Sequence, residues 1–425
     1  MIEIVRPGDP GYRDLRDVYT AAGAPAQVLR PGDADEVAEA LAQAVAAGGD
    51  LAVRSGGHGI SSIATNVGGS VIDLGRLASV EPIEDSDGLV RVGPGARWGD
   101  VAATLRPHGL VIGSGDSGDV GVGGLATTGG IGLFGRAHGL TIDNLVAADI
   151  VTADGRIRTV DAEREPDLFW ALRGAGANVG IATSFVFRAH RVPAVVHATL
   201  QYRIGRPEAF LRAWGETVEA APRDISAFLY LMSSDVALAT IVYARDEVAA
   251  ATAAIEPFLR LAPRLGQHAT VVPYAAVVGA SHAPHRGQQS ARTHSGLAVH
   301  LDDDVTTALG GLIRSGFGQL LQIRSAGGAI NDVAGDATAY AHRHQNFSIT
   351  AVADGRQGAF DEAWDRVRPA LDGLYLSFES TFSPELLVDA FPEPTLRRLR
   401  EIKQRVDPGN VFHQNFPLCD PLTAR

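Results

Sequence analysis

The sequence predicts a two-domain α+β protein, and three observations lead to this fold class. The chain has 425 residues, which is long for a single hydrophobic core. Apolar residues make up 45% of it, ample for a large core. Short strands separated by glycine-rich turns occupy the first part, whereas from residue 194 strands alternate with longer amphipathic helices. We therefore expect one domain over 1–193, a second over 194–394 and a closing segment over 395–425.

The first part shows clear local signals. Asp33 is placed as the N-cap of a helix that ends at Gly48-Gly49. Residues 147–160 alternate apolar and polar residues around Asp154-Gly155, which indicates a hairpin. The remaining apolar runs predict strands at 51–54, 71–74, 89–96, 110–112 and 184–192 and a helix at 97–107.

The second part predicts a separate layer built on an antiparallel sheet. Amphipathic patterns predict helices near 207–220, 247–262 and 357–371. Between them, the runs ALATIVYA, NFSITAVA and GLYLSFES are typical of strands. The last segment predicts a helix that stops at Asp407-Pro408-Gly409 and continues as an extended tail.

Composition excludes several classes of function. The formal net charge is −12 and no basic stripe occurs, so we expect no nucleic-acid partner. No run of 18 apolar residues occurs, so we expect no membrane partner. With a single cysteine, Cys419, the chain can form no intrachain disulfide. Its start, MIEIVRPGDP, has no apolar signal region, and we therefore expect a cytoplasmic protein.

A glycine-rich belt is the strongest hint of a ligand. Eleven of the 27 residues from Gly113 to Gly139 are glycine. Residues 113–118 spell GxGxxG, but the residues that follow are too rich in glycine for the helix that a dinucleotide fingerprint requires, and no acidic residue lies at the expected distance. Backbone N–H groups in glycine turns also bind anions without a helix. We therefore expect the loops at 55–59 and 113–132 to hold one diphosphate between them, since a Cβ would keep the backbone away from phosphate.

The chain resembles the berberine-bridge-enzyme-like group of FAD-linked oxidases, in the vanillyl-alcohol oxidase and p-cresol methylhydroxylase superfamily. The resemblance runs through nearly the whole chain in order. Its segments are RSGGHGIS, VIDLGRL, RVGPGARWGDVAATLRPHGL, VGVGGLATTGGIG, HGLTIDNLVAADIVTADG, PDLFWALRGAGANVGIATSF and DPGNVFHQNFPL. It implies a PCMH-type FAD-binding fold: an FAD domain at 1–193, an antiparallel-sheet substrate domain at 194–394, and a tail at 395–425 that returns to the FAD domain.

In the family, the histidine of the SGGH loop is bonded to the 8α-methyl group of FAD, which implies a covalent flavin at His58. Imidazole is a nucleophile when neutral, and its ordinary pKa keeps it mostly neutral at pH 7. Many relatives have a second tether through a cysteine, at the position that is Ser117 here. Because serine is a poor nucleophile, we expect a single covalent bond.

The resemblance also assigns residues that contact the cofactor. The first loop contributes its backbone beside His58, and the belt contributes the opposite side of the diphosphate. ANVGIAT and HQNFPL correspond to segments near the flavin ring. The implied cofactor residues are Arg54, Ser55, Gly56, Gly57, His58, Gly59, Ser117, Val120, Gly121, Gly123, Gly124, Gly129, Gly130, Asn178, Gly180, Ile181 and Asn415.

Reactivity follows from the same resemblance. Val120 corresponds to a position that controls oxygen access in the family, and valine resembles the permissive form, so we expect O₂ as electron acceptor. Family alcohol oxidases use a tyrosine as the base, but Phe378 stands at that position and cannot accept a proton. The candidates for the base are Tyr375, Glu379, Tyr340 and His342.

The resulting hypothesis is an FAD-linked oxidase of a small alcohol, amine or natural-product intermediate. An amine bound in its neutral form would need no base. A dehydrogenase that uses another acceptor, and a flavoprotein that only sequesters a small molecule, remain alternatives. The histidines in HAPH (282–285) and HRH (342–344) lack the carboxylate or cysteine partners of a metal site, and we expect no metal.

Overall fold

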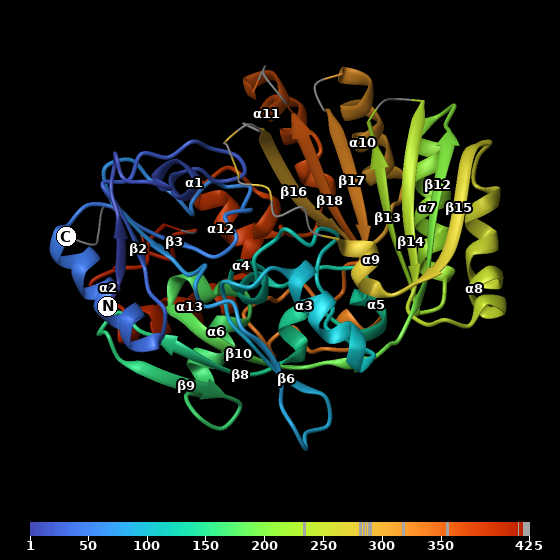
Figure 1. The fold of residues 1–425 in the computed structure, drawn as a ribbon. Coiled ribbons are helices and arrows are strands. Elements are labelled where there is room, and N and C mark those ends of the chain that lie inside the picture. The colour runs from blue at the N-terminus through green and yellow to red at the C-terminus, as the bar shows by residue number, and fades with distance from the viewer. Residues whose placement is uncertain are drawn as a thin grey trace.

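The computed structural model describes residues 1–232, 235–279, 283, 285, 287, 291–316, 319–353, 357–414 and 416–419. Its elements form two parts, each built on its own β-structure (Figure 1). In the described residues, the first part holds two small sheets and a two-stranded pair of β7 (Leu110–Val111) with β11 (His190–Arg191), and the second part holds one large sheet. The predicted α+β, antiparallel-sheet fold class is confirmed.

The first small sheet positions the histidine loop. Its strand order is β1-β2-β4-β3, with β2, β4 and β3 parallel. The helix α2 packs on it, and the Asp33 carboxylate accepts the amide N–H of Glu36 as the predicted N-cap. The SGGH loop follows directly after β3. The bounds are β1 (Glu3–Val5), α1 (Tyr12–Arg16), β2 (Gln27–Arg30), α2 (Ala34–Ala47), β3 (Leu51–Arg54) and β4 (Ser70–Asp73).

The second small sheet is antiparallel, with strand order β5-β6-β10-β8-β9. The predicted hairpin is confirmed as β8–β9, with Val151 opposite Ile157. Helices α3, α4 and α6 share one buried cluster with it. The bounds are β5 (Val80–Pro82), β6 (Leu89–Val92), α3 (Trp98–Leu105), β7 (Leu110–Val111), α4 (Val122–Thr128), α5 (Gly135–His138), β8 (Leu145–Val151), β9 (Ile157–Asp161), α6 (Pro166–Ala175), β10 (Ile181–Arg188) and β11 (His190–Arg191).

The large sheet has seven antiparallel strands in the order β15-β12-β14-β13-β17-β18-β16. Helices α7, α8, α10 and α11 share one buried cluster with this sheet. The bounds are β12 (Val195–Arg203), α7 (Pro207–Ala220), β13 (Ile225–Leu231), β14 (Val236–Tyr243), α8 (Val248–Ile255), β15 (Arg264–Val272), α9 (Tyr274–Val278), β16 (Arg292–Ala298), α10 (Asp303–Ser315), β17 (Leu320–Ser325), β18 (Phe347–Ala353) and α11 (Gln357–Asp365).

Alternation along the central strands decides which face is covered. On β17, Leu321 and Ile323 belong to the cluster shared with the helices, whereas Gln322 and Arg324 lie on the other face. That second face is directed toward the glycine belt and the small sheets, which lie on the opposite side from α7 and α8 (Figure 1). The covered face therefore makes the core of the second part, and the other face is left to form a site.

Two predictions of local structure are wrong. The belt was expected to exclude helix, yet Val122–Thr128 form α4, because Val122 and Ala126 are fully buried and their packing outweighs the poor propensity of glycine. GLYLSFES was expected to be a strand, but Leu376–Phe378 form a short 3₁₀ turn. This segment lies beside β16, where the Ser380 amide donates to the Thr293 carbonyl.

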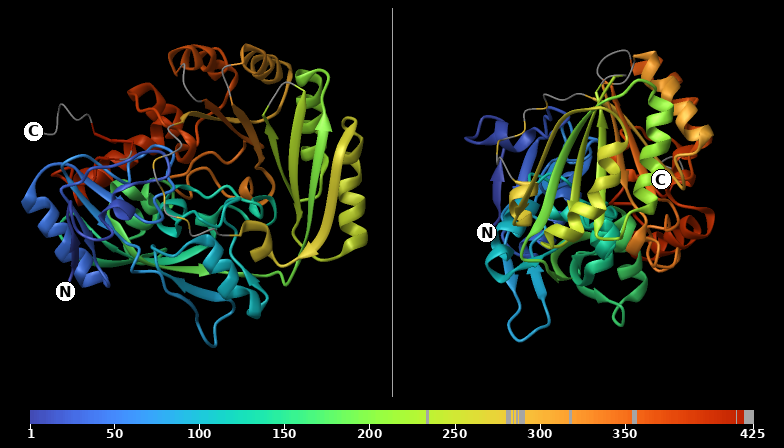
Figure 2. Two further views of the ribbon diagram at one scale, coloured as in Figure 1. Left: turned by 45° about the horizontal axis from the view of Figure 1, so that its top comes forward. Right: turned by 90° about the vertical axis from the view of Figure 1, so that its right-hand side faces the viewer.

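The C-terminal residues return to the first part of the molecule. Helices α12 (Pro384–Ala390) and α13 (Glu393–Val406) share the buried cluster of the second small sheet, and the left view of Figure 2 shows them away from the yellow-green strands. The buried Lys403 ammonium fixes this return by donating to the Asn178 carbonyl at 3.0 Å and to the Phe412 carbonyl and the Asp407 carboxylate at 2.6 Å. One buried cation thus joins α13 to two segments, at 178 and 412, next to the site described below.

We expect Lys403→Met to lower the free energy of unfolding by about 3 kcal/mol, because it leaves the Asp407 carboxylate buried without its cation. Arg405→Met is the matched control, since the Arg405–Asp167 ion pair is exposed and worth under about 1 kcal/mol. Urea unfolding of both variants measures the difference. Equal losses for the two variants would contradict a central role for the buried ammonium.

Candidate functional site

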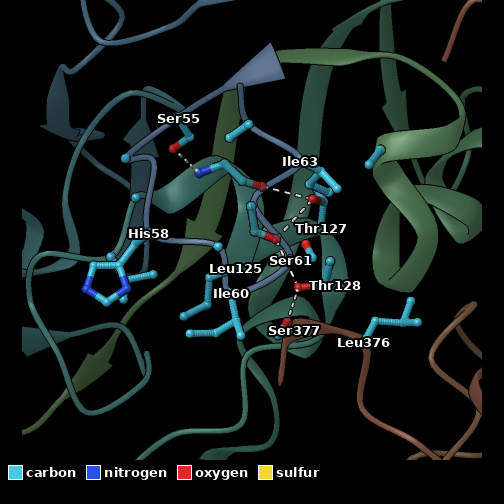
Figure 3. A pocket seen from close by; sticks show the side chains of 18 of the residues that line it. Ser55, His58, Ile60, Ser61, Ile63, Leu125, Thr127, Thr128, Leu376 and Ser377 are labelled. Atoms are coloured by element: carbon cyan, nitrogen blue, oxygen red, sulfur yellow. Dashed lines mark hydrogen bonds between the residues drawn. The ribbon is translucent and has the colours of Figure 1, made fainter. Parts of the chain in front are cut away.

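A cavity of about 460 Å³ lies between the two parts. Its lining comes from the loop after β3, the glycine belt, the segment 176–182, strands β16, β17 and β18, the turn at 375–378 and the C-terminal tail. Figure 3 shows one end of it, with His58 on the first loop and the Thr128 hydroxyl 2.8 Å from the Ser377 hydroxyl. Pockets between domains are common sites for ligands.

Two glycines let the histidine loop and the belt touch. A Cβ on Gly56 would lie 2.5 Å from the Gly121 nitrogen, and one on Gly121 would lie 2.1 Å from the Gly56 nitrogen. The Ser55 hydroxyl joins the same loops, because it donates to the Pro94 carbonyl at 2.6 Å and accepts the Gly123 N–H at 3.1 Å. Glycine is therefore required at both positions because any side chain would hold the two loops apart.

His58 lies half-buried in an aromatic group. Its ring stacks on Tyr19 with centroids 4.3 Å apart and planes 13° apart, and it meets His285 edge-on at 5.4 Å. Burial lowers the pKa of His58 below its ordinary value. The imidazole is therefore neutral at pH 7, which is its nucleophilic form.

The His285 of HAPH is the third ring of this group. Its Nε2 lies 3.0 Å from the Gly56 carbonyl oxygen, so it contacts the loop that carries His58. Burial, together with the neighbouring His58, lowers the pKa of His285 to about 4. Among the described residues, no three His, Cys, Asp or Glu side chains are grouped closely enough to hold a metal ion.

Most of the predicted cofactor residues line the cavity. They come from both loops and from the segment after α6. The residues are Ser55, Gly56, Gly57, His58, Gly59, Ser117, Val120, Gly121, Gly123, Gly124, Gly180 and Ile181. The structure thus brings the three predicted sequence segments to one cavity, although they are separated in the chain by parts of both small sheets.

Arg54, Gly129 and Gly130 lie outside the lining. The Arg54 guanidinium pairs with Asp73 and donates to backbone carbonyls of α1. It therefore anchors the start of the His58 loop to these neighbouring elements and does not face the cavity. Gly129 and Gly130 have positive φ angles of 144° and 85°, and a Cβ on Gly130 would collide with Thr141. The N–H of Gly130 donates to the Tyr375 hydroxyl at 2.9 Å, so this turn supports a tyrosine.

Of the two predicted asparagines, the structure describes only Asn178. Asn178 is buried and outside the lining, and its side-chain Oδ1 has no hydrogen-bond partner in the described part of the chain. Its neighbours Ala177 and Gly180 do line the cavity. Asn415 lies outside the described residues.

Of the four candidate bases, Tyr375 lines the cavity and the other three lie elsewhere. The Glu379 carboxylate is fully buried, where it accepts the Ser295 and Thr381 amides and contacts His294. Tyr340 packs edge-on against Tyr375 with ring centroids 6.0 Å apart.

His342, the remaining candidate, has its Nε2 3.0 Å from the Ala390 carbonyl oxygen. Burial raises the pKa of the Tyr340 hydroxyl and lowers that of the His342 imidazole. Tyr375 is consequently the one candidate whose side chain borders the space a substrate would fill.

The sequence reasoning missed a polar cluster at the other end of the cavity. Asp116 follows the belt's second glycine, and Gln322 and Arg324 stand two residues apart on β17. The Arg324 guanidinium lies 2.8 Å from the Asp116 carboxylate and 4.3 Å from the centre of the Phe378 ring. The alternation along β17 was the available signal, but nothing in the sequence pairs that strand with Asp116.

Comparison with known proteins defines the class. Residues 25–161 match the family model described as an FAD-binding domain. Relatives include the (R)-6-hydroxynicotine oxidase of Paenarthrobacter nicotinovorans, 34% identical over 193 residues, or 45% of this chain and 42% of the relative. The matched segment therefore spans about two fifths of that relative's length.

Two solved structures have the same fold over nearly the whole chain. A xylooligosaccharide oxidase from Myceliophthora thermophila, in complex with xylobiose, superposes with a TM-score of 0.87 at 23% identity, covering 99% of this chain and 98% of that one. The glucooligosaccharide oxidase of Acremonium strictum superposes with a TM-score of 0.84 at 22% identity, covering 96% and 95%. The latter is described as carrying 6-S-cysteinyl, 8α-N1-histidyl FAD.

Residues 25–161 thus resemble an FAD-binding domain, and the whole chain has the two-domain, PCMH-type fold of these solved structures. The predicted resemblance and the prediction of FAD as cofactor are confirmed. The site fits this cofactor, because close glycine loops and a neutral imidazole border one cavity. Within the described residues, no helix is both long and apolar enough to cross a membrane.

We expect Gly121→Ala to abolish FAD retention, because its methyl group would overlap Gly56 and separate the loops. Gly311→Ala is the control. Gly311 lies on α10 outside the cavity lining, and a Cβ there meets nothing within 4 Å, so this variant should keep its flavin. Flavin absorbance per protein after purification measures both, and retention by Gly121→Ala would contradict the role of the loop contact.

Proposed function

We propose that the protein is an FAD-dependent oxidase that takes a hydride from a small organic substrate and reduces O₂ to H₂O₂. The observation that carries the proposal is the single cavity that His58 borders at one end and Tyr375 and the strands of the large sheet border elsewhere. Bound FAD supplies the hydride acceptor and the electron transfer to oxygen. An alcohol, amine or natural-product intermediate, and a place in secondary metabolism, fit this chemistry.

In this proposal His58 holds the flavin through one covalent bond. Its lowered pKa and its stacking on Tyr19 keep the imidazole neutral and fixed in orientation. Ser117 lines the same cavity at the position where many relatives have a second, cysteine tether. Since a serine hydroxyl is a poor nucleophile, it is left as a hydrogen-bonding group beside the flavin.

Tyr375 acts as the base for an alcohol. Its phenolic oxygen accepts the Gly130 N–H at 2.9 Å, which fixes the position of that oxygen at the cavity wall, where a substrate hydroxyl could give up its proton. Phe378 at the family's tyrosine position packs 5.6 Å from the Tyr375 ring, between centroids, and contacts Arg324. Tyr375 thereby has a fixed position, while Phe378 contributes an apolar wall.

Val120 supports oxygen as acceptor. It lines the cavity and is only partly buried, and its carbonyl accepts the Trp98 N–H, so the loop around it is held in place. A dehydrogenase with a different acceptor is the second candidate. The cytoplasmic location stays a prediction.

Anaerobic mixing with a panel of sugars, amines and aromatic alcohols tests the function. We expect at least one compound to bleach the flavin, and air to restore the colour with one H₂O₂ per turnover. Bleaching that persists in air but is relieved by a quinone would favour the dehydrogenase. Binding of compounds without any bleaching would leave only sequestration.

We expect Tyr375→Phe to slow flavin reduction by an alcohol more than tenfold, equivalent to about 1.4 kcal/mol or more of barrier. Tyr340→Phe is the matched control, because its ring contacts Tyr375 but does not line the cavity, and its rate should stay within about threefold of wild type. Stopped-flow reduction measures both rates. A loss smaller than tenfold in Tyr375→Phe would remove it as the base.

A further inference from the structure

The register of the large sheet arranges the cavity-facing side chains in rows. One row runs Ser295, Thr350, Gln322 and Tyr230, because each is directly opposite the next on β16, β18, β17 and β13. The row beside it runs Thr293, Val352 and Leu320. Five of these seven side chains line the cavity, namely Thr293, Leu320, Gln322, Thr350 and Val352. The substrate end is thus an apolar face crossed by neutral hydrogen-bonding groups.

Only one pair of formal charges borders this cavity among its described lining residues, Asp116 and Arg324. Their nearest atoms are 2.8 Å apart, and the exposed fractions of the side chains are 23% for Asp116 and 6% for Arg324. The formal charges cancel. At the substrate end the lining therefore offers a ligand no net charge, whereas the diphosphate of FAD is assigned to the backbone N–H groups of the two glycine loops.

Both members of the pair are already engaged. The second oxygen of Asp116 accepts from the Tyr230 hydroxyl at 2.8 Å and from the Gln322 amide at 3.0 Å. Burial acts to raise the pKa of Asp116, but Arg324 and these donors hold it below its usual value, so the carboxylate stays ionised. Arg324 also donates to the Ile131 carbonyl and lies over the rings of Phe228 and Phe378.

A charged ligand would therefore enter without a counter-ion. Burying an unpaired charge costs several kcal/mol, more than one weak contact returns. A neutral ligand has no such cost and meets neutral polar side chains, because Gln322 and Thr350 line this end of the cavity.

We propose that the substrate end accepts uncharged molecules that present hydroxyl or carbonyl groups, and that Asp116 sets this specificity by cancelling the charge of Arg324. The inference rests on the proposed function and narrows its substrates toward neutral alcohols and away from protonated amines. Asp116 acts through Arg324 and is a positioning residue, with no part in the hydride step.

Three probes of similar shape test the inference: benzoate, benzamide and benzamidine, which are negative, neutral and positive at pH 7. Calorimetric titration of the flavin-loaded protein measures their affinities. Wild type should bind benzamide at least about tenfold more tightly than either ion. Asp116→Asn keeps the shape and leaves Arg324 unbalanced, so it should shift the benzoate-to-benzamide affinity ratio about tenfold or more toward benzoate.

Asp119→Asn is the matched control. This carboxylate stands three residues further along the same loop, pairs with Arg97 at 3.2 Å and does not line the cavity, so the wild-type ratio should persist. Arg324→Gln is a second variant of opposite sign and should shift preference toward benzamidine. Wild-type preference for an ion, failure of all three probes to bind wild type, or equal ratios in the two aspartate variants would overturn the inference.

These probes are not oxidised, so binding and turnover fail separately. A flavin that no alcohol bleaches, combined with the expected order of probe affinities, would refute the oxidase and leave the charge selectivity standing. Turnover of neutral alcohols with no charge dependence in any variant would refute the selectivity and leave the oxidase.

Discussion

The contact between Gly56 and Gly121 is the constraint on which the site depends. The loop after β3 and the loop after β7 approach until their backbone atoms would overlap any Cβ. This contact sets where His58 stands relative to Ser117 and Val120, which line the same cavity. Ser55 secures the contact with hydrogen bonds to both Pro94 and Gly123. Glycine is needed at these positions because a Cβ would prevent the two loops from touching. The contact of the loops then forms the surface on which we expect the cofactor to bind.

The large sheet supplies the second half of the site by a different principle. Four helices cover one face, and alternation along each strand sends every second side chain to the other. Arg324 connects this face to the glycine belt, because its guanidinium pairs with the Asp116 carboxylate and donates to the Ile131 carbonyl. The cofactor end is therefore built from backbone, where glycine matters, and the substrate end from side chains, where single substitutions can change specificity.

Much of the first part could be predicted from the sequence because its signals are local. The N-cap at Asp33, the hairpin at Asp154-Gly155 and the SGGH loop each depend on residues within one short window. The belt helix α4 could not be predicted, because its stability comes from burial of Val122 and Ala126. The turn at Leu376–Phe378 likewise follows from its contact with β16, which no local pattern records.

The site was predictable to the same extent. The resemblance pointed to loop residues that line the cavity, but of the residues it assigned to the diphosphate, Gly129 and Gly130 lie outside the lining, against Tyr375 and Thr141. Asp116 and Arg324 are 208 positions apart, and only the register of the large sheet joins them. Long-range pairing of this kind leaves no trace in a single sequence.

The mass of the tryptic peptide 55–76, which contains His58, tests the central claim most directly. Protein purified with its flavin and then denatured should yield this peptide heavier by one FAD, and His58→Ala protein should yield it without the added mass. An unmodified peptide from yellow wild-type protein, with all of its FAD released by acid precipitation, would contradict the account.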